Sequence, residues 1–357
     1  MKPRVCLVFP HLLLGGGETA LMAVAEALRE DIVLQACAFE SPEDRVSGIL
    51  RRELEERLGG VTLIRHRWEL RPCFRSADVV LWYGVVPAVA DVLASLAVQG
   101  RRPGSVRVVH TSREEDGPAF HRRWRQVIDR TVCVHPGGAR RIPGAVFVPN
   151  TCSPDRLQGH RLEPSSNLPT LGFLGRLVPQ KNVAWLVENL EALGASLLLQ
   201  VFDTPFQTAA DLAGLAERCG VAGRVCFLPP GREVGTLLRS VDALVIASQH
   251  EGFPMVAVEA GLLGTPVIST RVGALPELFS EEMLFVDSRE GFPDLASMQN
   301  ALAKLRAVPG PVWGRRLQER VATLCARERV VASYRDVLRS VCERQTSGTA
   351  ISASGPR

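Results

Sequence analysis

The stretch TLGFLGRLVPQKNVAWLVENL, residues 170–190, carries the pattern that decides the fold. Its first six residues have the apolar, glycine-containing composition of a buried strand, and a turn with Pro179 follows. After Asn182 the apolar residues recur at helical spacing, and asparagine is favoured as the residue that caps a helix N-terminus. The sequence therefore predicts a strand, a turn and a helix capped by Asn182, which is the repeating unit of a parallel α/β sheet.

Short apolar runs of this kind alternate with helical patterns along the whole chain. Those of the first half are RVCLVF, IVLQACAF, VTLI, DVVLWYG, SVRVVH, TVCV and AVFV. Those of the second half are TLGFLG, SLLLQVF, RVCFL, ALVIAS, PVIST and EMLFV. The fold class is therefore α/β, with two Rossmann-like, doubly wound parallel-sheet domains expected to face each other across a cleft.

Residues 150–170 between the halves are polar, rich in proline and without hydrophobic period, and we expect them to link the domains. The expected domains are residues 1–155 and residues 156–345, the second of which includes the trailing helices. The small polar residues at 346–357 are expected to form a disordered tail.

Composition excludes several classes of protein. The net charge of +4 is mild for a chain of 357 residues, so no nucleic-acid partner is expected. Pro10 and His11 interrupt the first apolar run, and no run approaches the roughly 18 residues of a transmembrane helix, so we expect a cytoplasmic protein. The nine cysteines form no C-x-x-C pair, which favours reduced thiols over a zinc site or a disulfide framework.

A second segment, DALVIASQHEGFPMVAVEAGLLGTPVISTRVGALPEL at 242–278, predicts a strand that runs into a helix. Pro254 suits the first helical position, while Gly264 and Pro266 suit the end of the helix. The start of this helix, from Phe253 through Met255 to Val256, would present free backbone N–H groups to an anion.

Four charged residues accompany these two strand ends. Arg176 and Lys181 are two cations that would suit a diphosphate, and Lys181 would oppose the helix dipole unless an anion lies nearby. Glu251 precedes the second helix and Glu259 follows eight positions later, and carboxylates accept hydrogen bonds from sugar and ribose hydroxyls. Any one of these four residues could instead be a solvent-exposed charge at the start of a helix that binds no ligand. The presence of two cations and two carboxylates together favours a nucleotide-sugar site.

The glycine-rich segment LGGGET, residues 14–19, has two interpretations. Gly15, Gly17 and Ala20 match the dinucleotide fingerprint, and Glu40 closes the second strand at a suitable distance for a nicotinamide cofactor. However, residues 9–14 separate the strand from the glycines, whereas the fingerprint needs a tight turn. We therefore expect Gly16 and Gly17 to approach a phosphate of a different ligand.

These motifs resemble glycosyltransferase family 4, the retaining, nucleotide-sugar-dependent enzymes with the GT-B fold. The resemblance rests on GRLVPQKN, on EVGTLLRSVDALVIASQHEGFPMVAVEAGLLGTPVIS and on VGALPEL, with weaker matches at LGGGET, His110 and VPNTCSPDRL. The chain departs from the family pattern at VFDTPF, residues 201–206, and at Pro229 and Pro230, close to the base-binding region, so the resemblance leaves the nucleotide open.

The resemblance implies that residues 1–155 bind the acceptor and residues 156–345 bind the donor. It also implies a role for each matching residue, and Gly16 and Gly17 would approach a donor phosphate or the acceptor. Arg176 and Lys181 would neutralise the donor diphosphate, Glu251 would contact the transferred sugar, and Glu259 the nucleotide ribose. His110, at the end of SVRVVH, would point toward the donor sugar. Departure of the nucleotide and attack of the acceptor on the same face is the implied mechanism, with phosphate as base and no metal or other cofactor.

An arginine-rich segment lies in the first half. Residues 101–141 carry ten arginines against four acids, and residues 113–130 suggest a helix with Phe120, Trp124, Val127 and Ile128 on one stripe. The stripe would dock on its own domain, or the basic flanks would contact an anionic membrane surface as a peripheral protein does.

The sequence therefore predicts a hexosyltransferase that uses a nucleotide-diphosphate sugar, with UDP or GDP favoured, and an acceptor hydroxyl. A non-catalytic nucleotide-sugar-binding subunit is the first alternative. A GT-B epimerase or phosphorylase and an NAD(P)-dependent oxidoreductase are the others.

Overall fold

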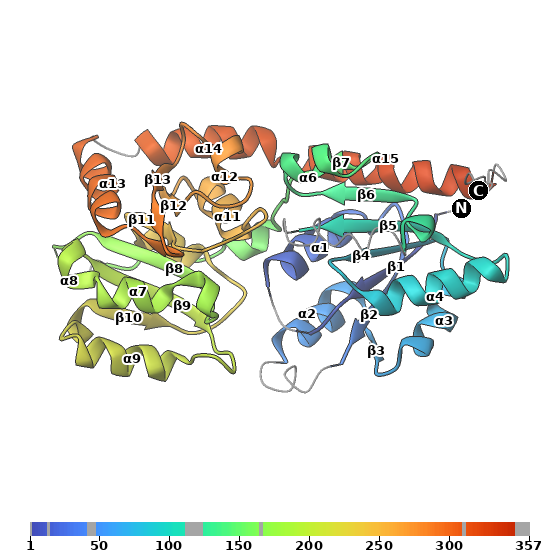
Figure 1. The fold of residues 1–357 in the computed structure, drawn as a ribbon, viewed down its shortest axis with the longest axis horizontal. Coiled ribbons are helices and arrows are strands. Elements are labelled where there is room, and N and C mark those ends of the chain that lie inside the picture. Colours follow the sequence, from blue (N-terminus) through green and yellow to red (C-terminus); the bar gives the residue numbers. More distant parts are fainter. Residues whose placement is uncertain are drawn as a thin grey trace. The chain divides into compact units, whose positions relative to one another are not determined.

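The computed structural model describes residues 2–12, 15–40, 48–110, 124–163, 167–308 and 312–346. They form two compact units (Figure 1). Unit 1 combines Met1–Pro149 with the chain from Arg327 onward, and unit 2 is the continuous stretch Asn150–Ala326. Each unit contains one parallel sheet with helices on both faces (Figure 1).

The elements of unit 1 alternate strand and helix as expected. They are β1 (Arg4–Phe9), α1 (Gly16–Ala27), β2 (Val33–Phe39), α2 (Ile49–Leu58), β3 (Thr62–Ile64), η2 (Arg67–Glu69), α3 (Leu70–Ser76), β4 (Val79–Tyr83), α4 (Pro87–Val98), β5 (Gly104–Val109), η4 (Arg125–Val127), β6 (Arg130–Cys133), α6 (Pro136–Arg141), β7 (Val146–Phe147) and α15 (Arg327–Thr346).

Unit 2 follows the same alternation. Its elements are η5 (Pro154–Leu157), β8 (Thr170–Arg176), η6 (Pro179–Lys181), α7 (Val183–Glu188), α8 (Leu190–Leu193), β9 (Ser196–Phe202), α9 (Ala209–Arg218), η7 (Ala222–Arg224), β10 (Val225–Leu228), α10 (Gly235–Ser240), β11 (Ala243–Ile246), α11 (Met255–Leu263), β12 (Val267–Thr270), α12 (Leu275–Leu278), β13 (Leu284–Val286), β14 (Ser288–Arg289), β15 (Phe292–Pro293), α13 (Leu295–Ala307) and α14 (Val312–Leu324).

Both sheets are doubly wound, because the strand order reverses direction within each of them. The sheet of unit 1 has the order β3-β2-β1-β4-β5-β6-β7, and that of unit 2 has the order β10-β9-β8-β11-β12-β13. The reversals lie between β1 and β4 and between β8 and β11. Ligands of such sheets bind at these switch points, at the carboxyl ends of the strands.

The strand predictions are confirmed in both units, and every expected run overlaps a strand of the parallel sheets. The strands read as continuous apolar runs because helices cover both faces of each sheet. In unit 2 the buried core is formed by residues such as Leu171, Leu186 and Leu199, and in unit 1 by residues such as Val80, Trp82 and Leu93.

The expected domain division differs from the structure at the C-terminal end. The sequence assigns residues 327–345 to the second domain, but α15 packs against β5 in unit 1. Val341 of α15 is buried, and a Cβ atom at Gly104 of β5 would lie 2.2 Å from its Cγ1, so the glycine permits the close approach. The predicted tail begins at the end of α15, and its residues 347–357 lie outside the described part of the chain.

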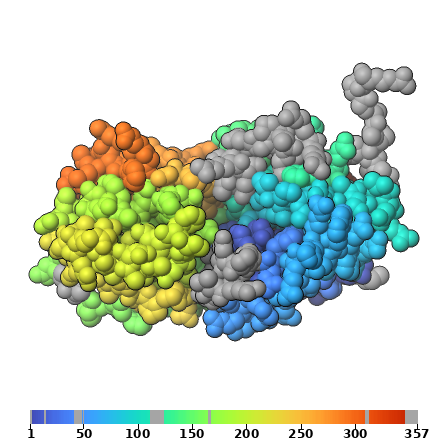
Figure 2. Space-filling model, turned by 60° about the horizontal axis from the view of Figure 1, so that its bottom comes forward, coloured from blue at the N-terminus to red at the C-terminus, as the bar shows by residue number. Residues whose placement is uncertain are grey.

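Unit 2 is folded from one uninterrupted stretch, and in the space-filling view its green, yellow and orange residues lie together (Figure 2). The expected link at 150–170 is not an exposed connector at its start. Asn150, Thr151, Cys152 and Ser153 are all buried in unit 2. The side chains of Asn150 and Thr151 donate hydrogen bonds within unit 2, which composition alone does not reveal.

Among the described residues, no helix has both the length and the apolar character needed to cross a membrane. All nine cysteines are free thiols, and Sγ of Cys6 lies 3.7 Å from Sγ of Cys37 without a covalent bond.

Candidate functional site

The switch point of unit 2 brings together the two loops that carry the predicted charged residues. β8 and β11 are neighbouring parallel strands, with Ala243 paired to Leu171 and Leu244 to Gly172. The loops that follow the two strands therefore leave the sheet at the same edge. Beyond the strands the two loops are joined directly, because the backbone N–H of Gln249 donates to the carbonyl of Gln180 at 2.8 Å.

Asn182 fixes this arrangement, but not by capping a helix. It precedes α7 in the left-handed conformation, with φ of 53°, and makes no side-chain capping bond to that helix. Its Nδ2 instead donates to the carbonyls of Ala247 at 2.8 Å and Gly291 at 2.7 Å. The capping prediction was therefore wrong for the side chain, which ties the loop after β8 to the end of β11.

Lys181 and Glu251 meet at the switch point although they are 70 residues apart. The Lys181 Nζ donates to Glu251 Oε1, and the hydroxyl of Ser248 donates to the same oxygen at 2.7 Å. The two side chains are only 20% and 11% exposed. Arg176, the last residue of β8, is half-buried beside this loop and forms no ion pair with the described residues.

The start of α11 lies directly after Glu251. Pro254 is the N-cap and Met255 the first helical residue, one position later than expected, and Gly264 ends the helix in the left-handed conformation as predicted. The side chains of Phe253 and Met255 are buried, while Val256 is partly exposed. No side chain caps α11, so its first N–H groups make the positive end of the helix available to an anion.

Gly273, in the VGALPEL motif, shapes the loop before α11. It has a φ of +55°, and a Cβ atom there would lie 2.0 Å from the carbonyl oxygen of Gly252 and 2.9 Å from that of Glu251. The next residue, Ala274, donates its backbone N–H to Gly252 at 2.7 Å. Glycine is required at 273 for both its backbone conformation and its contact with the Glu251 loop.

Glu259 lies in α11 with its side chain fully buried. Its Oε1 accepts a hydrogen bond from Nε of Arg156 at 2.7 Å, and the Arg156 side chain is 9% exposed. Glu259 Oε2 is buried and has no hydrogen-bond partner among the described residues. Sequence patterns do not reveal Arg156, because it precedes Glu259 by 103 residues in a stretch without periodicity.

In unit 1 the predicted glycines begin α1. Gly15 is the N-cap, and a Cβ atom at Gly17 would lie 3.0 Å from the Tyr83 ring. The Tyr83 hydroxyl donates to the buried carboxylate of Glu18 in the first turn, and His11 Nδ1 lies 3.1 Å from the same oxygen. Packing against Tyr83 therefore explains the glycine at 17, and the phosphate role of Gly16 and Gly17 stays a prediction.

His110 follows β5, as expected, at the carboxyl end of the unit 1 sheet. Its ring meets the edge of Tyr83 with ring centroids 5.3 Å apart and planes at 78°. Burial, with a smaller contribution from the charge of His135, lowers the pKa of His110 from its ordinary value of 6.5 to about 4. The imidazole is therefore neutral near pH 7, a state in which it donates or accepts a hydrogen bond without adding charge.

The features that favour a nicotinamide cofactor in the sequence do not form a dinucleotide site in unit 1. Six residues separate the end of β1 at Phe9 from the first residue of α1 at Gly16. The Glu40 carboxylate accepts a hydrogen bond from Arg65 Nε at 2.7 Å. A dinucleotide fingerprint needs a tight turn directly after the strand, and the six residues between β1 and α1 are too many for it. The Glu40 carboxylate, which would bind the ribose of the cofactor, is bonded to Arg65 instead.

Most of the helix expected at 113–130, residues 113–123 with Phe120, lies outside the described residues. The described remainder docks on its own unit, because Trp124 and Val127 are buried in the unit 1 core and Ile128 packs against it. The chain there forms the short 3-10 helix η4 rather than a continuous helix to residue 130.

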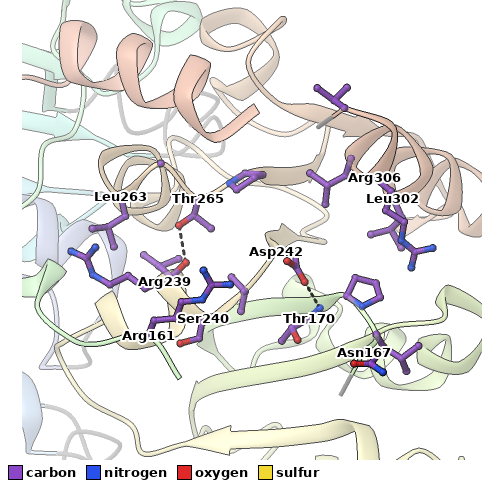
Figure 3. A pocket seen from close by; sticks show the side chains of 18 residues that line it. Arg161, Asn167, Thr170, Arg239, Ser240, Asp242, Leu263, Thr265, Leu302 and Arg306 are labelled. Carbon is purple, nitrogen blue, oxygen red and sulfur yellow. Dashed lines mark hydrogen bonds between the residues drawn. The ribbon is translucent and has the colours of Figure 1, made fainter. Parts of the chain in front are cut away.

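Unit 2 also contains a cavity of about 960 Å³ at the amino ends of β8, β11 and β12 (Figure 3). Its lining includes Arg161, Arg239 and Arg306, and the Asp242 carboxylate accepts a hydrogen bond from the Thr170 backbone at 2.8 Å (Figure 3). None of the predicted site residues lines it, so it is separate from the switch point. Within the described ranges no three His, Cys, Asp or Glu side chains gather as metal ligands would.

Residues 168–305 match the family model described as "Glycosyl transferases group 1". A D-inositol 3-phosphate glycosyltransferase from Actinosynnema mirum is 38% identical over 119 residues, which are 30% of this chain and 28% of that protein. One from Mycobacteroides abscessus is 27% identical over 277 residues, or 71% of this chain and 59% of that protein. The chain thus spans less than two thirds of the length of these relatives.

Solved structures agree in fold over nearly the whole chain. Anabaena HepE in complex with UDP has a TM-score of 0.74 at 15% identity, covering 94% of this chain and all of that one. HepE has also been solved with UDP-glucose, with a TM-score of 0.73 at 17% identity, covering 95% of this chain and 100% of that one. A glycosyltransferase from Rickettsia africae has a TM-score of 0.74 at 15% identity, covering 95% and 98%. These likenesses show the GT-B architecture of two parallel-sheet units.

Proposed function

We propose, on the premise that residues 168–305 belong to the glycosyl transferases group 1 family, that this protein transfers a sugar from a nucleotide-diphosphate donor to an acceptor hydroxyl. The observation that carries the proposal is the meeting of Lys181 and Glu251 at the switch point of unit 2, directly before α11. A cation, a carboxylate and a free helix start suit a phosphate joined to a hydroxyl-rich sugar.

Each predicted residue has a role in this proposal. Lys181, Arg176 and the N–H groups of Phe253 to Val256 offset the charge that grows on the diphosphate as it leaves. Glu251 accepts hydrogen bonds from the transferred sugar, and Glu259 from the ribose. His110, Gly16 and Gly17 of unit 1 contact the donor sugar, its phosphate or the acceptor.

The reaction exchanges one glycosidic bond for another. The bond between the anomeric carbon and the diphosphate oxygen breaks, and a bond to the acceptor oxygen forms. The acceptor proton passes to the leaving phosphate, and attack on the face of departure retains the anomeric configuration. A hexose-type sugar on UDP or GDP is the proposed donor, and the UDP complexes of HepE support UDP.

The test is replacement of Lys181 by alanine. We expect nucleoside diphosphate release from UDP-, GDP-, ADP- or dTDP-sugars to fall by roughly 10²- to 10³-fold, the usual effect of removing one group that stabilises transition-state charge. Release is measured with a panel of sugar acceptors and without acceptor. The fold should persist because the Lys181 side chain is partly exposed at the end of the short helix η6.

Lys304→Ala is the matched control, because this lysine is exposed on α13, far along the chain from the predicted donor residues. Unchanged release in the Lys181 variant would refute the proposal. Binding of a nucleotide sugar without any release would favour the non-catalytic subunit instead.

Two further expectations belong to the same proposal. Because Arg176 and Lys181 supply positive charge, EDTA should leave turnover unchanged, and loss of turnover restored by Mg²⁺ would contradict a metal-free reaction.

We also propose a cytoplasmic location with peripheral contact to anionic lipid through residues 101–141. In the described part of this segment Arg102 already pairs with Asp129 through two hydrogen bonds of 2.8 Å, so co-sedimentation with anionic vesicles tests the remaining arginines.

A further inference from the structure

The segment from Asn150 to Gly159 is part of the wall of unit 2 rather than a connector. Asn150 Nδ2 donates to the carbonyl of Phe253 at 2.8 Å, in the loop before α11. Thr151 Oγ1 donates to the carbonyl of Cys325 at 2.9 Å. The segment is therefore fixed at its start to the same loop that carries the proposed donor contacts.

The segment is equally constrained at Arg156. The backbone N–H of Val234 donates to the carbonyl of Arg156 at 2.8 Å, and Arg232 forms two hydrogen bonds with the neighbouring Asp155. A Cβ atom at Gly235 would lie 2.3 Å from the carbonyl oxygens of Leu157 and Gln158, so the segment lies in direct contact with the start of α10. Arg156 thus extends from a backbone with little freedom to move.

The guanidinium of Arg156 in turn fixes Glu259. The contact of 2.7 Å between Nε and Oε1 occurs between side chains that are 9% and 0% exposed. A hydrogen bond between two charged groups is short and strong, and removal of either partner would leave an uncompensated buried charge. The hydrogen bond to Arg156 therefore holds the Glu259 side chain in one defined orientation.

The other oxygen of the Glu259 carboxylate, Oε2, indicates that a ligand binds here. Oε2 of Glu259 is buried and lacks a hydrogen-bond partner among the described residues, and buried acceptors in folded proteins are rarely left so. A carboxylate oxygen can only accept, so the missing partner is a donor such as a hydroxyl group. Glu259 is the fifth residue of α11, about 6 Å along the helix from its start.

We propose that Arg156 is a positioning residue: it holds Glu259 so that Oε2 accepts a hydrogen bond from a ribose hydroxyl of the nucleotide. The inference rests on the proposed function, because it takes the ligand to be a nucleotide whose diphosphate lies at the start of α11. It adds a residue outside the region 168–305 to the donor site and gives it a measurable effect on ribose recognition.

The experiment compares ribose recognition in the full-length protein and its Arg156→Met variant. Binding of UDP, GDP and ADP, and of their 2′-deoxy and 3′-deoxy forms, is measured by calorimetry. We expect the wild-type protein to bind one ribonucleotide at least 10-fold more tightly than one of its deoxy forms. In Arg156→Met this preference should fall to within about threefold, while the deoxy form binds as before.

Three further variants make the result specific. Glu259→Gln should lose the preference as well, and Arg156→Lys should keep part of it, because a lysine retains the charge but not the planar guanidinium. Arg218→Met is the matched control, since Arg218 is exposed on α9 of the same unit and its loss should leave the preference unchanged. In turnover, Arg156→Met should raise the donor KM while kcat changes by less than about threefold.

The outcomes separate the inference from the function on which it rests. If none of the nucleotides binds the wild-type protein, the proposed function fails and the inference fails with it. If they bind but Arg156→Met keeps the full preference for ribose, or the wild-type protein shows none, only the positioning role of Arg156 is overturned. Should Arg156→Met fail to fold, the same comparison in Arg156→Lys decides, because an undiminished preference there contradicts the inference.

Discussion

His110 shows how its surroundings set the charge of one side chain. The pKa of its imidazole is lowered to about 4 because burial disfavours the charged form. Between about pH 4 and 6.5 the unfolded chain therefore binds a proton that the folded chain does not, and the free energy of unfolding falls as the pH falls through this range. Above pH 6.5 the effect disappears, because both states are neutral.

This linkage predicts a pH-dependent difference between the wild-type protein and His110→Gln, whose side chain stays neutral. Between pH 7.0 and 4.5 the wild-type protein should lose about 1–3 kcal/mol more of its unfolding free energy than the variant. Denaturant titrations at both pH values measure the difference. An equal loss in both proteins would contradict the lowered pKa of His110.

Gly273 illustrates a second residue whose surroundings determine its type. Gly273→Ala should destabilise unit 2 by about 2–4 kcal/mol, since it adds a positive φ to a clash with the Gly252 carbonyl. Gly220→Ala is the control, because Gly220 has a φ of +70° but a Cβ atom there would meet nothing within 4 Å, and it should cost only about 1 kcal/mol. Chemical denaturation compares the two variants, and equal costs would show that the contact with Gly252 is unimportant.

At the level of single residues, the sequence could locate polar groups but not their partners. Arg176, Lys181, Glu251 and Glu259 were placed at strand ends and a helix start because local patterns mark these positions. The sequence predicts that Lys181 and Glu251 lie near each other, but not that they form a hydrogen bond. It gives no indication of the hydrogen bond between Arg156 and Glu259, because hydrophobic periodicity carries no information about partners that are distant in the sequence.

Secondary-structure elements were the easiest feature to predict. A buried parallel strand is an apolar run bounded by turns, and each such run became a strand of one of the sheets. The segment 150–159 was misjudged for the opposite reason. Its polar composition is typical of an exposed link. Its polar groups are nevertheless buried, because they form hydrogen bonds with the loop before α11, with the chain before α10 and with Cys325.

Helix α15 provides a prediction at the level of an element. Val341→Asp places a charge in the contact between α15 and β5, and should destabilise unit 1 by about 3 kcal/mol or more. Hydrogen exchange read by mass spectrometry should rise in the peptides of β1, β4 and β5 and not in those of β8 and β11. Gln345→Asp, on the exposed side of α15, is the control and should leave both sets unchanged.

If hydrogen exchange rose equally in the peptides of both units, α15 would not be part of a core that belongs to unit 1 alone. The same measurement therefore also tests the division of the chain into units at 149/150 and 326/327.

For the whole molecule, the number of domains, the α/β class and the parallel sheets followed from length and alternation, whereas the assignment of the last helix did not. An amphipathic helix presents the same pattern whichever sheet it covers, so α15 could not be assigned from its own residues. The small residue that receives it, Gly104, lies more than 200 positions earlier and carries no mark of its partner.

Because unit 2 is an insertion within unit 1, the two units cannot mature in the order of their residues. During synthesis, β1 to β7 leave the ribosome first but must wait for α15, which emerges only after all of Asn150–Ala326. The inserted unit has its whole sequence available earlier and can fold while its host is unfinished. Chains truncated at residue 326 and released from the ribosome should accordingly expose the apolar face of β5 to chaperones while unit 2 is already folded.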